Sequence, residues 1–461
     1  MPSGPDNLVS HPRYLEEFNR ARGLLLGHPR RWRVIYHYDG DGVAAASALL
    51  RAFARLGYPA QATPLFGVER ERISQLLRSS PGPVLITDTG ASWLDLLARH
   101  PQPVIVLDHH RYVPPAANPD HLALVNPLDW EVDGMNELSA ATLAWLFTIF
   151  LDPANWDNAP WGLSGAIHDR QHIGGFRGLN LKLLEEAAGR SLLEKRRGLP
   201  LFGPSVGQAV AGSVDPFVRG LSGHPEAARS FVKELGIDPD RPPAKLVPEE
   251  STRLAKAIRS RLEKDGILPE FVDLADGERW FVRSHGLDAE EISNLQNATG
   301  RAGIPGVGVA YALGDARAAD RARAAEEDWR TGILRGLRRI EEAGVHALPH
   351  LKWFESPEMP LAGTQAGLAM SYLLTPEVPV FVFTDAGAEP TKVSSRGLVR
   401  QVERGLDLAS VCRVAASEVG GEGGGHRVAS GATIPPGARE RFLEAADREL
   451  GRQLGGEGAV R

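Results

Sequence analysis

Cysteine is almost absent from this sequence of 461 residues, which contains only Cys412. A single cysteine excludes an intramolecular disulfide framework and a zinc site built from several thiolates. It also indicates a reducing compartment inside the cell. The first ten residues lack the basic and apolar regions of a secretory signal. The most apolar stretch, residues 140–151, is too short to cross a bilayer. We therefore expect a soluble, cytoplasmic protein that has no membrane partner.

An excess of positive charge is also missing, because 52 lysines and arginines face 58 aspartates and glutamates, a net charge of −6. This balance excludes a polycation, so any nucleic acid must be held by a local basic patch. The shares of hydrophobic residues (43%) and charged residues (24%) are ordinary for globular proteins and exclude a largely disordered chain. The arginines of residues 316–342 alternate with acidic residues. A solvated helix face is therefore the first interpretation of this stretch, and a nucleic-acid contact is the alternative.

Continuous apolar runs alternate with helical patterns in the first part of the chain. The runs are Arg33–Tyr38, Pro83–Thr87 and Pro103–Leu107, and each is followed directly by aspartate. Such runs are typical of parallel strands that are buried on both faces of a sheet. The sequence therefore predicts an α/β domain with a parallel sheet over residues 1–183.

The remaining chain predicts two further domains, in line with a prior of about 150 residues per domain. Residues 184–344 are expected to form a mostly helical insert that includes 193–198 and 316–342, with strand-like segments at 278–284 and 307–313. Residues 345–461 are expected to form a smaller α/β domain. Its predicted strands are 378–385 and 391–397, and its predicted helices are 407–419 and 438–454.

Carboxylates follow three successive strands at the carboxyl edge of the predicted sheet, where open α/β sheets bind their ligands. The side chains expected to converge there are Asp39, Asp41, Asp88, Asp108, His37, His109 and His110. Each aspartate alone is explained as a helix N-cap. Together, however, so many carboxylates would repel one another unless a divalent cation compensates them. Oxygen and imidazole ligands favour Mn²⁺ or Mg²⁺ over structural zinc, and their number suffices for two ions.

Several motifs coincide with a known family in order and spacing. The segments are HYDGDG (37–42), TDTG (87–90), DHH (108–110), IHDRQ (167–171) and GGGH (423–426). The first four resemble motifs one to four of the DHH phosphoesterases, and the last resembles the signature of their C-terminal DHH-associated domain. Within the family the chain is most similar to the archaeal RecJ-like nucleases, also through NPLDWEVDG (126–134). The resemblance implies a DHH domain and a DHH-associated domain with the active site in the interdomain cleft.

The resemblance also implies roles for residues around two Mn²⁺ or Mg²⁺ ions. Metal ligands would be His37, Asp39, Asp41, Asp88, His109 and Asp169, with Asp88 as the bridge. Asp108 would orient His109, and His110 would face the scissile phosphate and assist the leaving group. The fourth motif departs from the family pattern, because His168 stands where glycine is usual.

A grip for a substrate phosphate is predicted in the last domain. Gly423, Gly424 and Gly425 would let backbone N–H groups approach an anion, with His426 as a further donor. Arg396 matches the family's substrate-binding arginine, and its planar guanidinium suits phosphate. Lys392, Ser394 and Ser395 could add contacts. A flexible glycine linker and an ordinary polar edge strand are the alternatives.

These features together predict a metal-dependent phosphodiesterase. The function implied by the resemblance is a single-strand-specific exonuclease that hydrolyses DNA or RNA to mononucleotides during DNA repair or replication. One alternative is an oligoribonuclease or a cyclic-dinucleotide phosphodiesterase, because family members of similar architecture have these activities. Another is a replication scaffold that binds GINS, a role that can coexist with catalysis.

Overall fold

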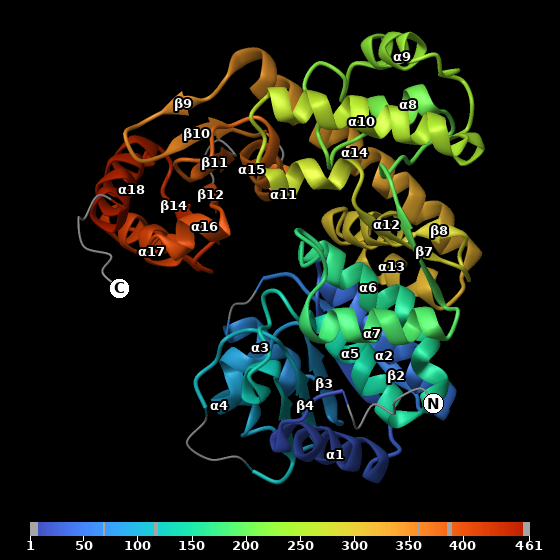
Figure 1. Cartoon of the computed structure of the whole chain (residues 1–461). Coiled ribbons are helices and arrows are strands. Elements are labelled where there is room, and N and C mark those ends of the chain that lie inside the picture. The colour runs from blue at the N-terminus through green and yellow to red at the C-terminus, as the bar shows by residue number, and fades with distance from the viewer. Residues whose placement is uncertain (1–7, 68–69, 115–118, 358, 385–389, 455–461) are drawn as a thin grey trace. The chain divides into compact units, whose positions relative to one another are not determined.

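Figure 1 shows the computed structural model of the protein, which describes residues 8–67, 70–114, 119–357, 359–384 and 390–454. The chain forms two compact units. The first combines residues 1–200 with 277–327, and the second combines residues 201–276 with 328–461. The boundary at residue 327 falls within a long helix, α14 (Ala316–Ala343). The three-part division after residues 183 and 344 stays a prediction.

A parallel sheet of five strands forms the centre of the first unit, as the sequence predicts. The strands are β1 (Trp32–His37), β2 (Ala60–Leu65), β3 (Val84–Thr87), β4 (Val104–Leu107) and β5 (Leu122–Val125). Their order is β2-β1-β3-β4-β5, and all neighbours run parallel. The three predicted runs are β1, β3 and β4. Because all strands run the same way, the residues after them lie at one edge of the sheet.

Both faces of this sheet are covered, which explains the nearly continuous apolar sequences of β3 (VLIT), β4 (VIVL) and β5 (LALV). Val34 and Tyr36 of β1 point into a core with helices on one face, whereas Ile35 points into a second core. The helices of the first core include α1 (Pro12–Gly27), α2 (Gly40–Leu56), α5 (Ala140–Leu151) and α6 (Ala159–His168). Those of the second core are α3 (Arg70–Arg78) and α4 (Leu94–Leu97).

Part of the predicted middle insert belongs to this first unit. It contains α12 (Ala289–Arg301), α13 (Pro305–Ala312) and a small sheet of β6 (Leu193–Arg197), β7 (Glu278–Val282) and β8 (Leu287–Asp288). Helix α7 (Gly178–Gly189) precedes the small sheet. Helix α12 packs against α6 and α2, so residues far apart in the sequence surround the same helix.

Two local predictions in the insert are wrong. The segment 307–313 is the helix α13 and not a strand. It begins with Pro305 in the first turn, and its short apolar run fits a buried helix as well as a strand. The segment 193–198 is the strand β6 and not a helix. β6 pairs antiparallel with β7, and the Arg196 guanidinium lies 3.5 Å from the Phe281 ring centroid. This pairing partner, more than 80 residues away, overrides the helical pattern.

The second unit contains a mixed sheet in the order β13-β14-β12-β11-β10-β9. Its strands are β9 (His346–Ala347), β10 (Lys352–Glu355), β11 (Val380–Thr384), β12 (Thr391–Arg396), β13 (Glu422–Gly425) and β14 (Ala429–Ile434). The same unit contains the helices α15 (Met359–Tyr372), α16 (Val399–Glu403), α17 (Leu408–Glu418) and α18 (Arg439–Leu454). The predicted strands 378–385 and 391–397 and both predicted helices are confirmed. Asp385, the last residue of the first of these strands, lies outside the described residues.

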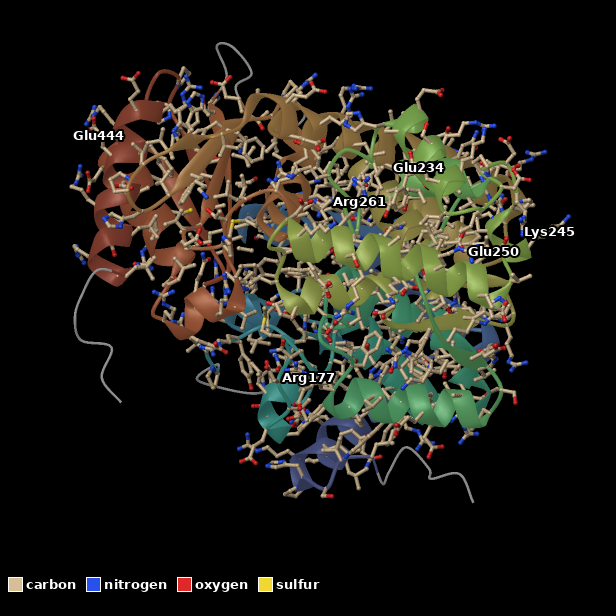
Figure 2. The ribbon with its side chains drawn as sticks, turned by 45° about the horizontal axis from the view of Figure 1, so that its top comes forward. Arg177, Glu234, Lys245, Glu250, Arg261 and Glu444 are labelled. Atoms are coloured by element: carbon tan, nitrogen blue, oxygen red, sulfur yellow. The ribbon has the colours of Figure 1, made fainter. Side chains whose placement is uncertain are left out.

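The second unit contains further helices. They include α8 (Val206–Ala211), α9 (Pro225–Glu234), α10 (Pro248–Lys264) and α11 (Pro269–Val272). Helix α10 buries Leu254, Ile258 and Leu262, a spacing of four residues that places them on one stripe. Arg261, labelled on α10 in Figure 2, extends over the ring of Phe231 of α9. Its guanidinium lies 4.8 Å from the ring centroid. None of the described helices has the length and apolarity that a membrane span needs.

A buried carboxyl group in the first unit predicts a measurable pH dependence of stability. The Glu17 carboxylate accepts hydrogen bonds from Trp130 Nε1 (2.8 Å) and the Asn126 backbone N–H (3.3 Å). Burial nevertheless raises its pKa to about 8. The unfolded chain therefore loses this proton near pH 4.5 while the folded chain keeps it. Stability contributed by Glu17 is complete below pH 4.5 and is lost as the pH rises to about 8.

Replacing Glu17 by glutamine keeps both acceptor contacts and removes the titration. We expect the free energy of unfolding of Glu17→Gln to fall less between about pH 5 and about pH 8 than that of the wild type. The difference should be on the order of a few kcal/mol, because one pKa unit corresponds to about 1.4 kcal/mol. Urea unfolding in EDTA at both pH values measures it. Parallel pH dependences of the two proteins would contradict the prediction.

Candidate metal centre

The loop after β1 provides the first carboxylate. Asp39 is the N-cap of α2, and its Oδ1 accepts a hydrogen bond from the Gly42 backbone N–H at 3.3 Å. The other oxygen, Oδ2, lies 3.1 Å from Nδ1 of His37. The N-cap interpretation is therefore correct for one oxygen, while the second faces the imidazole and can bind a metal.

Asp41, in the first turn of α2, is fully buried at the N-terminus of α5. Its Oδ1 accepts hydrogen bonds from Ser139 Oγ (2.9 Å) and the Ala141 N–H (3.0 Å), and its Oδ2 accepts one from the Ala140 N–H (2.8 Å). These donors, at the positive end of a helix dipole, hold the carboxylate in place. A carboxylate offers about four acceptor sites, so metal binding remains open to it.

Asp88 lies between His37 and His109. Its backbone has φ 60°, and its side chain is almost completely buried. One carboxylate oxygen, Oδ2, lies 3.4 Å from His37 Nδ1, and the other, Oδ1, lies 3.4 Å from His109 Nε2. One oxygen thus faces His37 and the other faces His109, which is the arrangement that a carboxylate bridging two cations needs.

The imidazole of His109 is oriented by a backbone carbonyl. Nδ1 lies 2.7 Å from the Gly134 oxygen, which can only accept, so Nδ1 carries the hydrogen. In the neutral imidazole, Nε2 then presents a lone pair. This nitrogen is buried and has no hydrogen-bond partner among the described residues. It lies 3.6 Å from Asp169 Oδ2 and 3.8 Å from Asp41 Oδ2. A buried acceptor facing carboxylates fits a metal ligand, because a cation satisfies both.

The carboxylates repel one another in this buried setting. Burial, followed by the charge of Asp88, raises the pKa of Asp41 to about 6. Burial and the charge of Asp41 also raise the pKa of Asp169 well above its usual value. Burial opposes charge on His37 and His109, but the neighbouring carboxylates prevail and both imidazole pKa values lie well above 6.5. Repulsion of this kind is what the sequence predicts, and divalent cations would relieve it.

The predicted metal ligands therefore meet in space. Groups of donor atoms within 4.8 Å of one another are formed by His37, Asp39 and Asp88, and by Asp41, His109 and Asp169. Asp88 adjoins both groups through its two oxygens. A third group of this kind combines Asp88, His109 and His110. The residues fit two divalent cations with oxygen and imidazole ligands, and their assignment as ligands stays a prediction.

Asp108 has a different partner from the expected one. Its Oδ1 lies 2.7 Å from Nδ1 of His110, while its Oδ2 accepts a hydrogen bond from the Ala91 N–H at 2.9 Å. The expectation that Asp108 orients His109 is wrong, because the Gly134 carbonyl takes that role. Asp108 instead orients His110. Burial raises the pKa of Asp108, but the His110 hydrogen bond outweighs it and the pKa falls to about 2.

The predicted phosphate grip is only partly assembled within the second unit. Alternation along β12 places Lys392, Ser394 and Arg396 on one face of the strand. Ser395 points the other way and is fully buried. Its hydroxyl donates to the Ser430 carbonyl oxygen at 3.1 Å. The Ser395 side chain is therefore not available to a substrate.

The glycine run forms the edge strand β13 and is not a linker. Gly424 pairs with Gly431 of β14, and Gly425 pairs with Ser430. Gly425 has φ 139°, a region that favours glycine. The backbone N–H of His426 donates to the Ala429 carbonyl oxygen at 2.8 Å, which closes the turn to β14. The His426 side chain is exposed.

The sequence interpretation missed residues that hold the site from a distance. Gln171 donates to the same Gly134 carbonyl oxygen at 3.0 Å. Arg301 of α12 donates to the Tyr38 hydroxyl at 3.0 Å, beside the loop that carries Asp39. Only the first could have been suspected, from its place in the fourth motif, because the second bond joins positions 263 residues apart.

Gly165 gives a test of how tightly Asp41 is packed. A Cβ at this position of α6 would lie 2.2 Å from Asp41 Oδ1 and 2.3 Å from the Ala141 Cβ. We expect Gly165→Ala to lower the free energy of unfolding by about 1–3 kcal/mol through overpacking, and to weaken Mn²⁺ binding. The matched control is Gly23→Ala on the exposed face of α1, where a Cβ meets nothing within 4 Å. The free energy of unfolding of Gly23→Ala should rise by about 0.5–1 kcal/mol, because alanine is more favourable than glycine within a helix. Equal thermal shifts in the two variants would contradict the tight packing.

Comparison with known proteins agrees with this geometry. Residues 31–159 match the DHH family, N-terminal domain, and residues 363–452 match the DHHA1 domain. The chain thus carries the N-terminal domain of the DHH family and a DHHA1 domain. The chain is also 26% identical over 450 residues to an uncharacterised protein of Methanocaldococcus jannaschii, and the match covers 95% of this chain and 98% of the relative. The predicted fold class and family are confirmed.

Solved structures share the fold of this chain. Exonuclease RecJ bound to manganese has a TM-score of 0.59 at 18% identity, and the match covers 98% of each chain. RecJ of Thermus thermophilus with Mn²⁺ has a TM-score of 0.58 at 18% identity, and the match covers 96% of this chain and 55% of that RecJ chain. CDC45 from Entamoeba histolytica has a TM-score of 0.67 at 10% identity, and the match covers 95% of this chain and 98% of the CDC45 chain.

Proposed function

We propose that this protein is a metal-dependent phosphodiesterase that removes mononucleotides from the ends of single-stranded DNA or RNA. The observation that carries the proposal is the position of Asp88, whose two carboxylate oxygens face His37 and His109. Two cations held by these groups would supply Lewis acidity for displacement at phosphorus. His37, Asp39 and Asp88 would hold one cation. Asp41, Asp88, His109 and Asp169 would hold the other.

The remaining residues would bind the substrate and move a proton. His110, oriented by Asp108, would donate a proton to the leaving oxygen. Lys392, Ser394 and Arg396 would contact a phosphate from one face of β12. The glycines of β13 and His426 would complete the grip. A preference for single strands and a role in DNA repair or replication belong to the same proposal.

A replication scaffold is the second candidate, favoured by the fold shared with CDC45. A scaffold that recruits GINS-type proteins needs no metal ligands. All six predicted ligands are nevertheless present here, and their ligand atoms fall into groups that lie within 4.8 Å of one another. An enzyme therefore explains more of the site than a scaffold alone, and the two roles are compatible.

Digestion of labelled oligonucleotides tests the proposal. Single strands of about twenty nucleotides, labelled at the 5′ or the 3′ end, are incubated with the protein and Mn²⁺, Mg²⁺ or EDTA. We expect mononucleotide products from DNA or RNA single strands, little cleavage of a blunt duplex and none in EDTA. Dinucleotides and cyclic dinucleotides in parallel reactions test the oligoribonuclease and cyclic-dinucleotide alternatives. Absence of cleavage of every substrate with either metal would reject the enzymatic proposal.

A further inference from the structure

His168 occupies a position at the metal centre that the predicted ligand set does not include. It is the last residue of α6, next to Asp169, and 16% of its side chain is exposed. Its Nε2 lies 3.6 Å from Oδ2 of Asp39. This is the same oxygen that lies 3.1 Å from His37 Nδ1. Two imidazoles thus flank one carboxylate oxygen.

The backbone of the first motif holds the His168 ring in its place. A Cβ on Gly40 would lie 2.6 Å from Nδ1 and 2.7 Å from Cγ of His168, so the ring lies directly against the glycine. The same Cβ on Gly40 would lie 3.2 Å from the Cβ of Asn297 on α12. The imidazole therefore lies against the first residue of α2 and faces Asp39.

His168 does not complete a group of metal ligands in the described part of the chain. The donor groups within mutual reach of 4.8 Å contain His37, Asp39 and Asp88, but not His168. His168 would therefore act on the cation held by His37, Asp39 and Asp88 only by contacting Asp39. Since Oδ1 of Asp39 accepts from the Gly42 N–H, the helix holds one oxygen of the carboxylate, while His37 and His168 both face the other oxygen.

We propose that His168 is a positioning residue, which fixes Asp39 for the cation held by His37, Asp39 and Asp88. This inference rests on the proposed two-metal function and deepens it, because it assigns different supports to the two cations. Partners of this kind, which contact a metal ligand and not the metal, typically change metal affinity about 10- to 100-fold. The effect should be confined to one of the two ions, since the contacts of Asp41, His109 and Asp169 with one another do not involve His168.

Titration with Mn²⁺ tests the inference. Calorimetry measures the binding, and electron paramagnetic resonance measures the free Mn²⁺. The wild type should bind two ions. His168→Gly, which introduces the residue usual in the family, should bind one ion with unchanged affinity and the other about 10- to 100-fold more weakly. His168→Gln, which retains an N–H donor, should recover part of this loss. The control His28→Gln removes a half-buried imidazole at the end of α1 and should bind like the wild type.

The outcomes separate this inference from the proposed function. Unchanged affinities in correctly folded His168→Gly would overturn it, and so would complete loss of one ion, which would make His168 a ligand. Equal weakening of both ions would also overturn it. Wild-type protein that binds two ions but cleaves no oligonucleotide would reject the proposed function alone. Circular dichroism and the melting temperature establish the fold of each variant.

Discussion

Asp88→Asn is expected to lower kcat/KM for single-stranded oligonucleotides by about 10³-fold or more. The amide side chain would offer one carbonyl oxygen where the carboxylate offers two, so it could not serve both donor groups, and the site would lose a negative charge. Several kcal/mol of charge stabilisation are at stake in a two-metal site, and each difference of about 1.4 kcal/mol corresponds to about tenfold in rate. Mn²⁺ titration should show at least one ion bound more weakly.

Asparagine is the informative substitution because of the backbone at this position. Asp88 has φ 60°, which asparagine adopts more readily than alanine. Alanine would add backbone strain to the loss of the ligand. A matched control is Asp95→Asn, which breaks an exposed ion pair with Arg70 and should leave activity unchanged. Retained turnover together with two-ion binding in Asp88→Asn would contradict the bridging role.

The carboxyl edge of the sheet is the part of the site that local sequence determines. Asp39, Asp88 and Asp108 each follow an apolar run within two residues, and parallel strands bring such positions together whatever the loops do. The strands β1, β3 and β4 were therefore predictable, with the convergence of the aspartates. Strand β2, with the sequence AQATPL, has no such run, and only its pairing with β1 reveals it.

The partners of these side chains depend on contacts that the sequence does not encode locally. His109 hydrogen-bonds Gly134, 25 residues away, and Asp108 turns to His110 instead. Similarly, the part of α12 that supports the first motif comes from a segment predicted as a separate insert. The burial of Ser395, however, could have been predicted from the sequence. In a strand of period two, Ser395 must face away from Ser394 and Arg396.

His110→Gln is expected to lower kcat by about 10²- to 10⁴-fold, the usual contribution of a positioned proton donor. His110 Nδ1 hydrogen-bonds Asp108, whose carboxylate is buried and ionised at neutral pH because its pKa is about 2. The His110 carbonyl oxygen accepts from Asn126 Nδ2 at 3.0 Å, which fixes the backbone. The imidazole is thereby held in one orientation, and 29% of the side chain remains exposed to an incoming substrate. Glutamine keeps the size and a donor but cannot release a proton to the leaving oxygen.

The ion-binding isotherm decides between the two roles open to His110. Its donor atom also lies within 4.8 Å of those of Asp88 and His109, so it could be a ligand. If it donates a proton, His110→Gln binds two Mn²⁺ ions like the wild type while kcat collapses and KM changes little. Asp88→Asn, in contrast, loses ion binding and turnover together. Loss of an ion in His110→Gln would assign His110 to the metal shell, and the proton would then have to reach the leaving oxygen from another group.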